Sequence, residues 1–415
     1  MHTADERLPR ALLKEPSRRQ ILGGSASTAI AIVAGQVVAG LSLLILARRL
    51  APEDFGAYAV LYATGVALGG LLDFGSSQLR IRELARGSGL DLFASWLWRR
   101  AVWQALAVAA MIGIAQLVGG NRVGLLAAAA LISQGFTLPI SLAWSGAVRA
   151  LRSPALGTWF VAAGNALLLV VVVAAPSRFL VDAAALAAMA SWLVTAACSW
   201  SVTRADFGSI RSRWVGNPWD GSAAFGFFGL AIVLQGLQVV VVGAVAGSTE
   251  AGELAAVARW VQPVYLAAAA FSTQTFPGMA GAASDAAARR ILRPIWAVSG
   301  FGAVIAAAIV VAAPTLVDRL LGDGYENSAA LLRALAIAAI PVLFNQPLAT
   351  FLQARGSERP VAISTSFIMA CLLAATAASA AWVGAIAAPV CFGVAQIVLL
   401  AALILLSRNR AKLFV

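Results

Sequence analysis

Long apolar runs without charged residues are the strongest constraint on how this chain folds. Residues 21–47 contain no Asp, Glu, Lys or Arg, a charged turn follows at 48–54, and a second uncharged run covers 55–72. An α-helix rises about 1.5 Å per residue, so about twenty apolar residues cross the roughly 30 Å hydrocarbon layer of a bilayer. These residues therefore predict a transmembrane helical hairpin.

The same pattern recurs to the end of the chain. Of 415 residues, 61% are hydrophobic and 12% are charged, against roughly 25% charged in soluble domains. The lengths and the Leu and Ala content favour helix over strand. We therefore predict an all-α membrane protein with twelve transmembrane helices, the further ten at about 101–119, 124–147, 155–175, 180–202, 223–246, 260–280, 295–313, 334–353, 361–380 and 384–406.

The basic residues are unevenly divided between the two ends of the predicted helices. The termini and even-numbered loops carry 23 of the 30 Lys and Arg residues, and the odd-numbered loops carry 7. Loops rich in Lys and Arg stay in the cytoplasm. Both termini are therefore predicted to be cytoplasmic. The net charge of +12 is explained by this topology, and no nucleic-acid partner is predicted.

A polar stretch divides the predicted helices into two sets of six. After the first helix the chain reads PEDFGAYA, and after the seventh it reads STEAGELA, which aligns Gly56 with Gly252 and Asp54 with Glu250. Such matches indicate a duplicated transporter fold with a pathway between its halves. The predicted organisation is a cytoplasmic tail at 1–20, a six-helix bundle at 21–202, a cytoplasmic linker at 203–222, a second six-helix bundle at 223–406 and a cytoplasmic tail at 407–415.

Residues that carry covalent or metal chemistry are scarce. The single His is His2, the three cysteines lie separately within predicted helices, and no Walker lysine motif is present. These features predict no metal site, disulfide framework or ATP hydrolysis. We expect a protein that is not an enzyme and has no cofactor, driven by an ion gradient or by removal of its product.

Four segments resemble one family of membrane transporters. They read LARRLAPEDFGAYAV, LLDFGSSQLRIRELA, AFSTQTFPGMA and LLGDGYENSAALLRALAIAAIPVLFNQPLATFLQARG. They are similar to the polysaccharide transporter branch of the multidrug/oligosaccharidyl-lipid/polysaccharide (MOP) exporter superfamily, which contains the Wzx-type flippases. The resemblance extends from about Ile21 to Leu406.

The resemblance implies a MOP/MATE-like fold, with two six-helix bundles around a central cavity that opens alternately to either face. It implies that the substrate is an oligosaccharide linked through pyrophosphate to a polyprenyl lipid, moved across the bacterial inner membrane for surface or exopolysaccharide biosynthesis. Polysaccharide polymerase or assembly proteins are the implied partners. Each unsatisfied polar group costs several kcal/mol in hydrocarbon, so such a head group needs a polar cavity.

Four arginines at the sparsely charged face are candidate substrate ligands. Arg48 and Arg49 end the first predicted helix, and Arg259 and Arg333 begin later ones, near the expected mouth of the cavity. A guanidinium can form two hydrogen bonds with a phosphate or a sugar carboxylate. The alternative is that these side chains extend to the membrane interface and fix helix ends.

Four further polar residues lie within or near predicted helices. Gln235 and Gln238 are three residues apart and so share one helix face; with Asn345 they are candidates to line a path for sugar hydroxyls. Hydrogen bonding between helices is the alternative. Asp73 is a candidate proton or sodium coupling site, or a partner of Arg80, and the alternative is a helix cap or an interfacial ion pair.

Two other functions remain in view beside a lipid-linked oligosaccharide flippase. A MATE-like, ion-coupled multidrug or metabolite antiporter would have acidic residues deep within its helices, and this chain has almost none. A membrane enzyme such as a polysaccharide polymerase would have a sizeable external loop with catalytic groups. The longest odd-numbered loop here covers only about 314–333. The sequence therefore favours the flippase.

Overall fold

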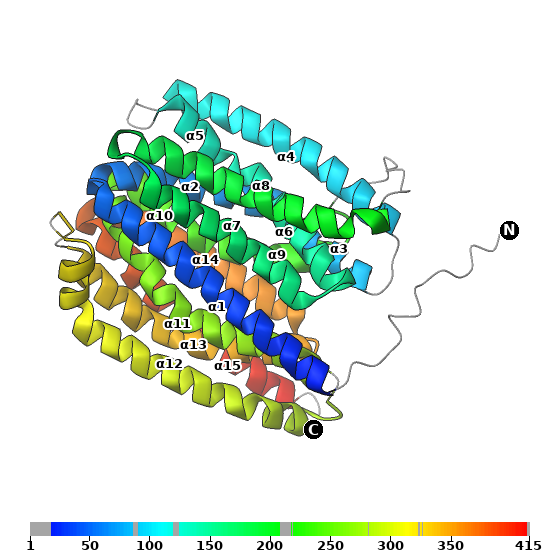
Figure 1. Ribbon diagram of the computed structural model, residues 1–415. Helices are drawn as coiled ribbons and strands as arrows, with labels where there is room; N and C mark the ends of the chain where they lie inside the picture. Colours follow the sequence, from blue (N-terminus) through cyan, green and yellow to red (C-terminus); the bar gives the residue numbers. More distant parts are fainter. Residues whose placement is uncertain are drawn as a thin grey trace.

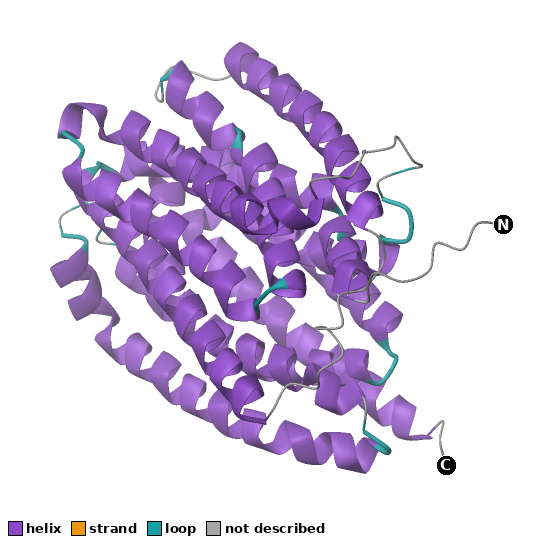
Figure 2. Cartoon of the chain, turned by 45° about the vertical axis from the view of Figure 1, so that its right-hand side comes forward, coloured by secondary structure: helices purple, strands orange, loops and turns teal. Residues whose placement is uncertain are grey.

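The computed structural model describes residues 18–85, 90–118, 124–207, 217, 219–280, 282–322, 324–325 and 327–412. Within these ranges, all regular secondary structure is helical (Figure 2). The first helix, α1 (Arg18–Arg49), begins at the same end of the bundle at which the last one, α15 (Ala387–Lys412), finishes (Figure 1). We call this the terminal end and the opposite one the distal end.

The first half of the chain forms one group of helices. Pro52 and Pro154 occupy the first turns of their helices, where the missing N–H would have had no helical partner. The α5 and α6 helices fall within one predicted membrane span and are separated by a turn at Ser133. After α1, this half contains α2 (Pro52–Asp73), α3 (Ser76–Ala85), α4 (Leu90–Val118), α5 (Leu125–Ile132), α6 (Gln134–Leu151), α7 (Pro154–Ala174), η2 (Ser177–Phe179) and α8 (Leu180–Phe207).

The second half forms the other group. Ser284 caps the longest helix, accepting a hydrogen bond from the Ala287 backbone N–H at 3.2 Å, which satisfies one of the donors left open at a helix start. Before α15, this half contains α9 (Ala223–Gly236), α10 (Gln238–Val245), α11 (Ser248–Ala280), α12 (Asp285–Leu320), α13 (Ser328–Ala354), α14 (Glu358–Val383) and η3 (Gly384–Ile386).

Over its described residues, each predicted span falls on one helix or on a pair of helices. Eight stretches of the described chain are long and apolar enough to cross a bilayer, and the protein is a multi-pass membrane protein. The largest difference is at α11, which begins at Ser248 and not near residue 260. The intervening residues include Glu, Ala, Leu and Arg, which are good helix formers whatever their polarity, so the helix continues where the apolar pattern stops.

Large apolar side chains cover the outside of the bundle. Trp382, Val311 and Phe367 are 88%, 82% and 69% exposed. This arrangement is expected where the surrounding solvent is lipid, because lipid is as apolar as the side chains themselves. Helix association then depends on close packing between the helices.

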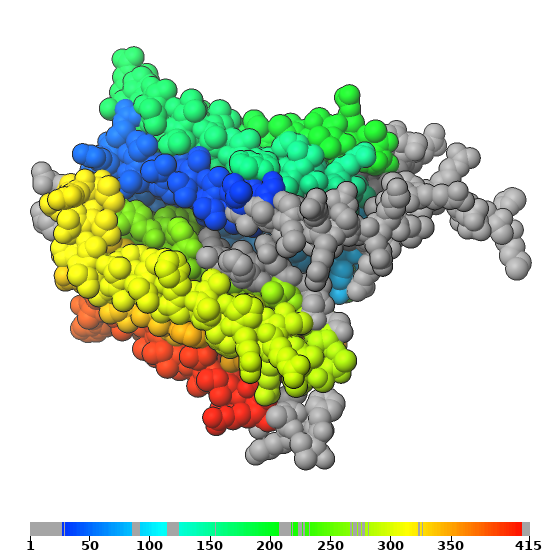
Figure 3. Space-filling model, turned by 60° about the horizontal axis from the view of Figure 1, so that its bottom comes forward, coloured from blue at the N-terminus to red at the C-terminus, as the bar shows by residue number. Residues whose placement is uncertain are grey.

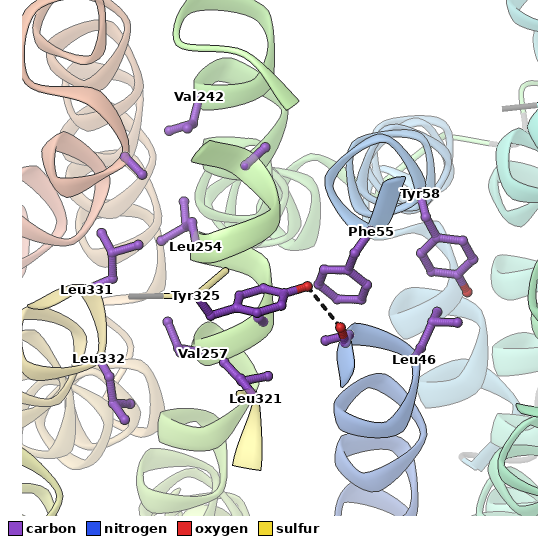
Figure 4. Close-up of a cluster of buried hydrophobic side chains, with 14 of the residues drawn as sticks. Leu46, Phe55, Tyr58, Val242, Leu254, Val257, Leu321, Tyr325, Leu331 and Leu332 are labelled. Atoms are coloured by element: carbon purple, nitrogen blue, oxygen red, sulfur yellow. Dashed lines mark hydrogen bonds between the residues drawn. The ribbon is translucent and has the colours of Figure 1, made fainter. Parts of the chain in front are cut away.

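The two halves meet along α2 and α11. In Figure 3 the surface of the first half (blue to green) lies opposite that of α12 to α15 (yellow to red), and part of α11 is visible between them. At the distal end a single cluster of buried side chains joins the halves, including Leu46 and Phe55 from the first and Val257 and Leu332 from the second (Figure 4). The halves are therefore packed together at this end.

Candidate functional site

A small pocket lies where the two halves face each other. Its volume is about 40 Å³, which is room for a few water molecules. Sites between helices of a bundle are common places for ligands to bind. The first half supplies most of the wall through α1, α2, α7 and α8, and the second half supplies an arginine from α11; the lining residues are Ala39, Leu43, Tyr58, Tyr62, Asn165, Leu168, Ala188, Ser191, Trp192 and Arg259.

Arg259 is half-buried and reaches the pocket from α11. Because α11 begins at Ser248, this arginine stands eleven residues, or about 16 Å, along the helix, and not at the start of a membrane span. Its Nη1 donates a hydrogen bond to Gln262 Oε1 at 3.0 Å, which holds the guanidinium beside its own helix. A charged side chain at membrane depth is costly and is therefore a functional candidate.

Aromatic rings form the wall beside Arg259. The Tyr58 and Tyr62 rings are stacked with centroids 6.2 Å apart, and Phe55 continues the stack towards the distal end at 6.5 Å from Tyr58. Trp192 lines the same pocket from α8. Such side chains combine a flat apolar face with a polar edge, a surface suited to the ring of a sugar.

Two small polar side chains complete the wall. Asn165 Nδ2 donates to the Gly35 carbonyl at 3.1 Å and thereby joins α7 to α1. Ser191, which is 4% exposed, donates to the Ala188 carbonyl at 2.7 Å. The pocket therefore combines one cation with aromatic, amide and hydroxyl groups.

The other three candidate arginines lie elsewhere. Arg49 donates from Nη1 to the Val172 carbonyl at 2.6 Å and from Nη2 to the Ala175 carbonyl at 2.7 Å, so it caps the open carbonyls at the end of α7. Arg48 is exposed. Arg333 is also exposed, and its Nε donates to the Val310 carbonyl at 3.3 Å. Of the four, only Arg259 lines the pocket formed by the described residues.

The candidate amides also lie away from this pocket. A turn at Leu237 separates α9 from α10, so Gln235 and Gln238 do not share one continuous helix as the sequence suggested. Gln238 donates to the Ala388 carbonyl at 3.1 Å. Asn345 is 3% exposed and donates to the backbone and side-chain oxygens of Gln396, each at 2.8 Å. Gln238 and Asn345 therefore join helices of the second half.

Asp73 belongs to a buried polar network in the first half. Its carboxylate is paired with Arg100, which is fully buried and also donates to Ser77 Oγ and, at 2.9 Å, to the Pro139 carbonyl. The partner considered from the sequence, Arg80, instead pairs with Glu83 at 2.7 Å. Arg100 lies just before a predicted span, so in the sequence it belongs to the loop charges.

The aromatic side of the pocket was not predicted from the sequence. The chain has four tyrosines; Tyr58 and Tyr62 line the pocket, Tyr265 packs against the distal cluster, and Tyr325 is buried within it. All four thus lie near the contact between the halves. This scarcity and the four-residue spacing of Tyr58 and Tyr62 were the available signal.

No protein-family model matches this sequence, and no curated protein is similar to it in a sequence comparison. The chain is nevertheless similar in structure to proteins whose structures have been solved. This similarity concerns the fold.

An inward-facing multidrug resistance MATE family transporter of the MOP superfamily has a TM-score of 0.69 at 16% identity, covering 92% of this chain and 98% of its own. An outward-facing conformation of a transporter of the same description has a TM-score of 0.65 at 16% identity, covering 98% of this chain and 99% of its own. The lipid II flippase MurJ, in an inward closed conformation, has a TM-score of 0.71 at 9% identity, covering 92% of this chain and 87% of its own. This chain therefore has the all-α membrane fold of MATE transporters and of MurJ, in agreement with the fold class expected from its sequence.

Proposed function

We propose that this protein is a flippase that moves a polyprenyl-pyrophosphate-linked oligosaccharide across the bacterial inner membrane by alternating access. The observation that carries this proposal is the position of Arg259, in a pocket shared by both halves and about 16 Å along α11. A guanidinium can bind a pyrophosphate through paired hydrogen bonds. The other lining residues are uncharged, which suits a head group whose negative charge is mostly its pyrophosphate.

The size of the pocket requires the halves to move. A pyrophosphate with its first sugar is far larger than the few waters that about 40 Å³ admits. Binding therefore requires the first half, at 21–202, and the second, at 223–406, to separate as two bodies. The inward-facing and outward-facing MATE structures support this motion for the fold, and the MurJ structure supports a lipid-linked substrate.

The direction of transport follows from the charge distribution. We propose that the terminal end faces the cytoplasm, because the loops there are rich in arginine, and that the distal end faces the periplasm. The substrate would then enter at the terminal end and leave at the distal end, where polymerase or assembly proteins would receive it. Proton or sodium coupling at Asp73 would require the ion to compete with Arg100 for the carboxylate.

A MATE-like antiporter is less well supported. Cation coupling within a central pocket calls for carboxylates there, whereas the ten lining residues include no Asp or Glu. Asp73 already has Arg100 as its partner. A flippase that holds an anionic head group by a cation accounts better for the pocket.

The test is a deletion strain complemented with the wild-type protein, Arg259→Ala, or Arg319→Ala as a control exposed on α12. We expect the deletion and Arg259→Ala to accumulate lipid-linked repeat units on the cytoplasmic leaflet and to lose surface glycan, while Arg319→Ala restores both. Normal delivery with increased drug sensitivity would instead indicate the antiporter. Repeat units that reach the periplasmic face but stay unpolymerised would indicate an enzyme.

A further inference from the structure

The first turns of α2 and α11 cross at two glycines. A Cβ placed on Gly56 would overlap the Ser248 carbonyl oxygen and lie 2.8 Å from the Gly252 nitrogen. A Cβ placed on Gly252 would overlap the Pro52 carbonyl oxygen and lie 3.0 Å from the Gly56 nitrogen. Small residues at such crossings allow helix backbones to touch in membranes. Neither position has room for a side chain.

This crossing is reciprocal. Each glycine touches the residue four positions before the other glycine, and the sequence alignment of the halves pairs Gly56 with Gly252 and Pro52 with Ser248. The same surface is therefore used by each half against the other, as in a two-fold symmetric interface. The contact depends equally on both halves and is lost when they separate there.

A side-chain hydrogen bond joins the halves beside this crossing. Tyr325, in the connection between α12 and α13, donates its hydroxyl to the Ala47 carbonyl at 3.0 Å (Figure 4). Ala47 is in the last turn of α1, where backbone carbonyls have no partner within the helix. The tyrosine is 2% exposed, so this bond lies in a dry part of the interface.

The Tyr325 hydroxyl is held in its donating form. Burial raises the pKa of Tyr325 above the ordinary 10.0, and the nearby Glu253 carboxylate raises it further, because both disfavour a phenolate. The neutral hydroxyl is therefore present throughout the physiological range. Titration of this group therefore does not break the bond to Ala47 in that range.

The crossing lies directly on the distal side of the pocket. Gly56 precedes Tyr58 by two residues, and Gly252 precedes Arg259 by seven, or about 10 Å of helix. We propose that the Gly56–Gly252 crossing and the Tyr325–Ala47 bond form a latch that closes the Arg259 pocket towards the distal end. The latch regulates the site named under the proposed function, and its parting gives the pocket access to the distal face.

The proposal is tested by measuring which face of the membrane reaches the pocket. Cys198, Cys371 and Cys391 are replaced by serine, and Ala39→Cys places a thiol in the pocket wall. Protein in oriented vesicles is then treated with a membrane-impermeant thiol reagent from either face. Gly56→Ala and Gly252→Ala are compared with Gly300→Ala, a matched change in α12 where the new Cβ meets nothing within 4 Å.

We expect each latch substitution to raise the labelling rate from the distal face about tenfold, through a shift in population towards the distally open state. Gly300→Ala leaves the rate unchanged. Tyr325→Phe keeps the ring and removes the hydrogen bond, so it decides the matter if the glycine variants fail to fold; we expect a rise of about threefold. Rates equal to that of Gly300→Ala, or equal rises from both faces, would overturn the latch.

The labelling measurement uses no substrate, so its result is independent of what the protein transports. Distal labelling that follows the latch substitutions, in a protein whose deletion leaves repeat units correctly distributed, would support the latch and refute the flippase. Distal labelling rates that these substitutions do not change, in a protein whose deletion makes repeat units accumulate in the cytoplasmic leaflet, would refute the latch and support the flippase.

Discussion

At the scale of single residues, the presentation of Arg259 depends on Gln262. The amide oxygen accepts a hydrogen bond from the guanidinium at 3.0 Å, and a bond to a charged group contributes about 1.5–3 kcal/mol. Gln262→Ala should therefore allow the guanidinium to swing out of the pocket, and this should lower the rate of flipping about tenfold. Initial rates in vesicles measure this, with Gln353→Ala on α13 as control. A wild-type rate for Gln262→Ala would show that Arg259 needs no such support.

The Asp73–Arg100 pair predicts non-additive effects on stability. Removing one partner leaves the other charge buried without a partner and destabilises the protein by about 3–5 kcal/mol, whereas replacing both with apolar residues often changes its stability little. Asp73→Ala should lower the melting temperature in detergent, and the double variant with Arg100→Met should recover most of the loss. Additive losses would show that the pair is not coupled. A sodium-dependent melting temperature in the wild type would support ion binding at Asp73.

At the scale of helices, α2 contacts the second half at both of its ends. At its terminal end Phe74 has a left-handed backbone with φ of 39°, which is rare for a residue with a side chain. Its ring packs against Gly226 of α9, where a Cβ would overlap it. Trp219, in the linker before α9, also donates from Nε1 to the Leu72 carbonyl at 2.8 Å. This corner is therefore the counterpart, at the terminal end, of the Gly56–Gly252 crossing.

This corner gives a prediction opposite in direction to that of the latch. Gly226→Ala should force Phe74 away from α9 and raise labelling of Ala39→Cys from the terminal face, with no rise from the distal face. The matched control is Gly229→Ala, whose Cβ would lie 3.8 Å from the Gly75 nitrogen, an ordinary contact. If both variants label alike, the contact of Phe74 with Gly226 does not restrict access.

Helices were predictable from the sequence to the extent that they are apolar. The long apolar runs correspond to helices, but the break at Leu237 and the start of α11 at Ser248 have no counterpart in hydropathy. Arg259 was identified as a candidate from its type and place. Its aromatic neighbours were not, because Tyr58 lies about 200 residues away in the chain and no local pattern encodes contact between the halves.

At the scale of the whole molecule, the direction of flipping depends on which end faces the cytoplasm. The α1 helix begins and the α15 helix finishes at the terminal end of the bundle (Figure 1), and the loops there are rich in arginine, so this end should be cytoplasmic. A reporter fused after Lys412 should be active only if it functions in the cytoplasm. One fused after Leu321, at the distal end of α12, should be active only if it functions in the periplasm.

The reversed result would have a specific consequence for the mechanism. The latch would then close the pocket towards the cytoplasm. Its opening would admit the substrate at the distal end, which is the end at which we propose that the substrate leaves. The contacts of Gly56, Gly252 and Tyr325 would be unchanged, but they would control loading. Orientation therefore decides whether the latch controls uptake or release, and the fusions measure it without any assumption about the glycan.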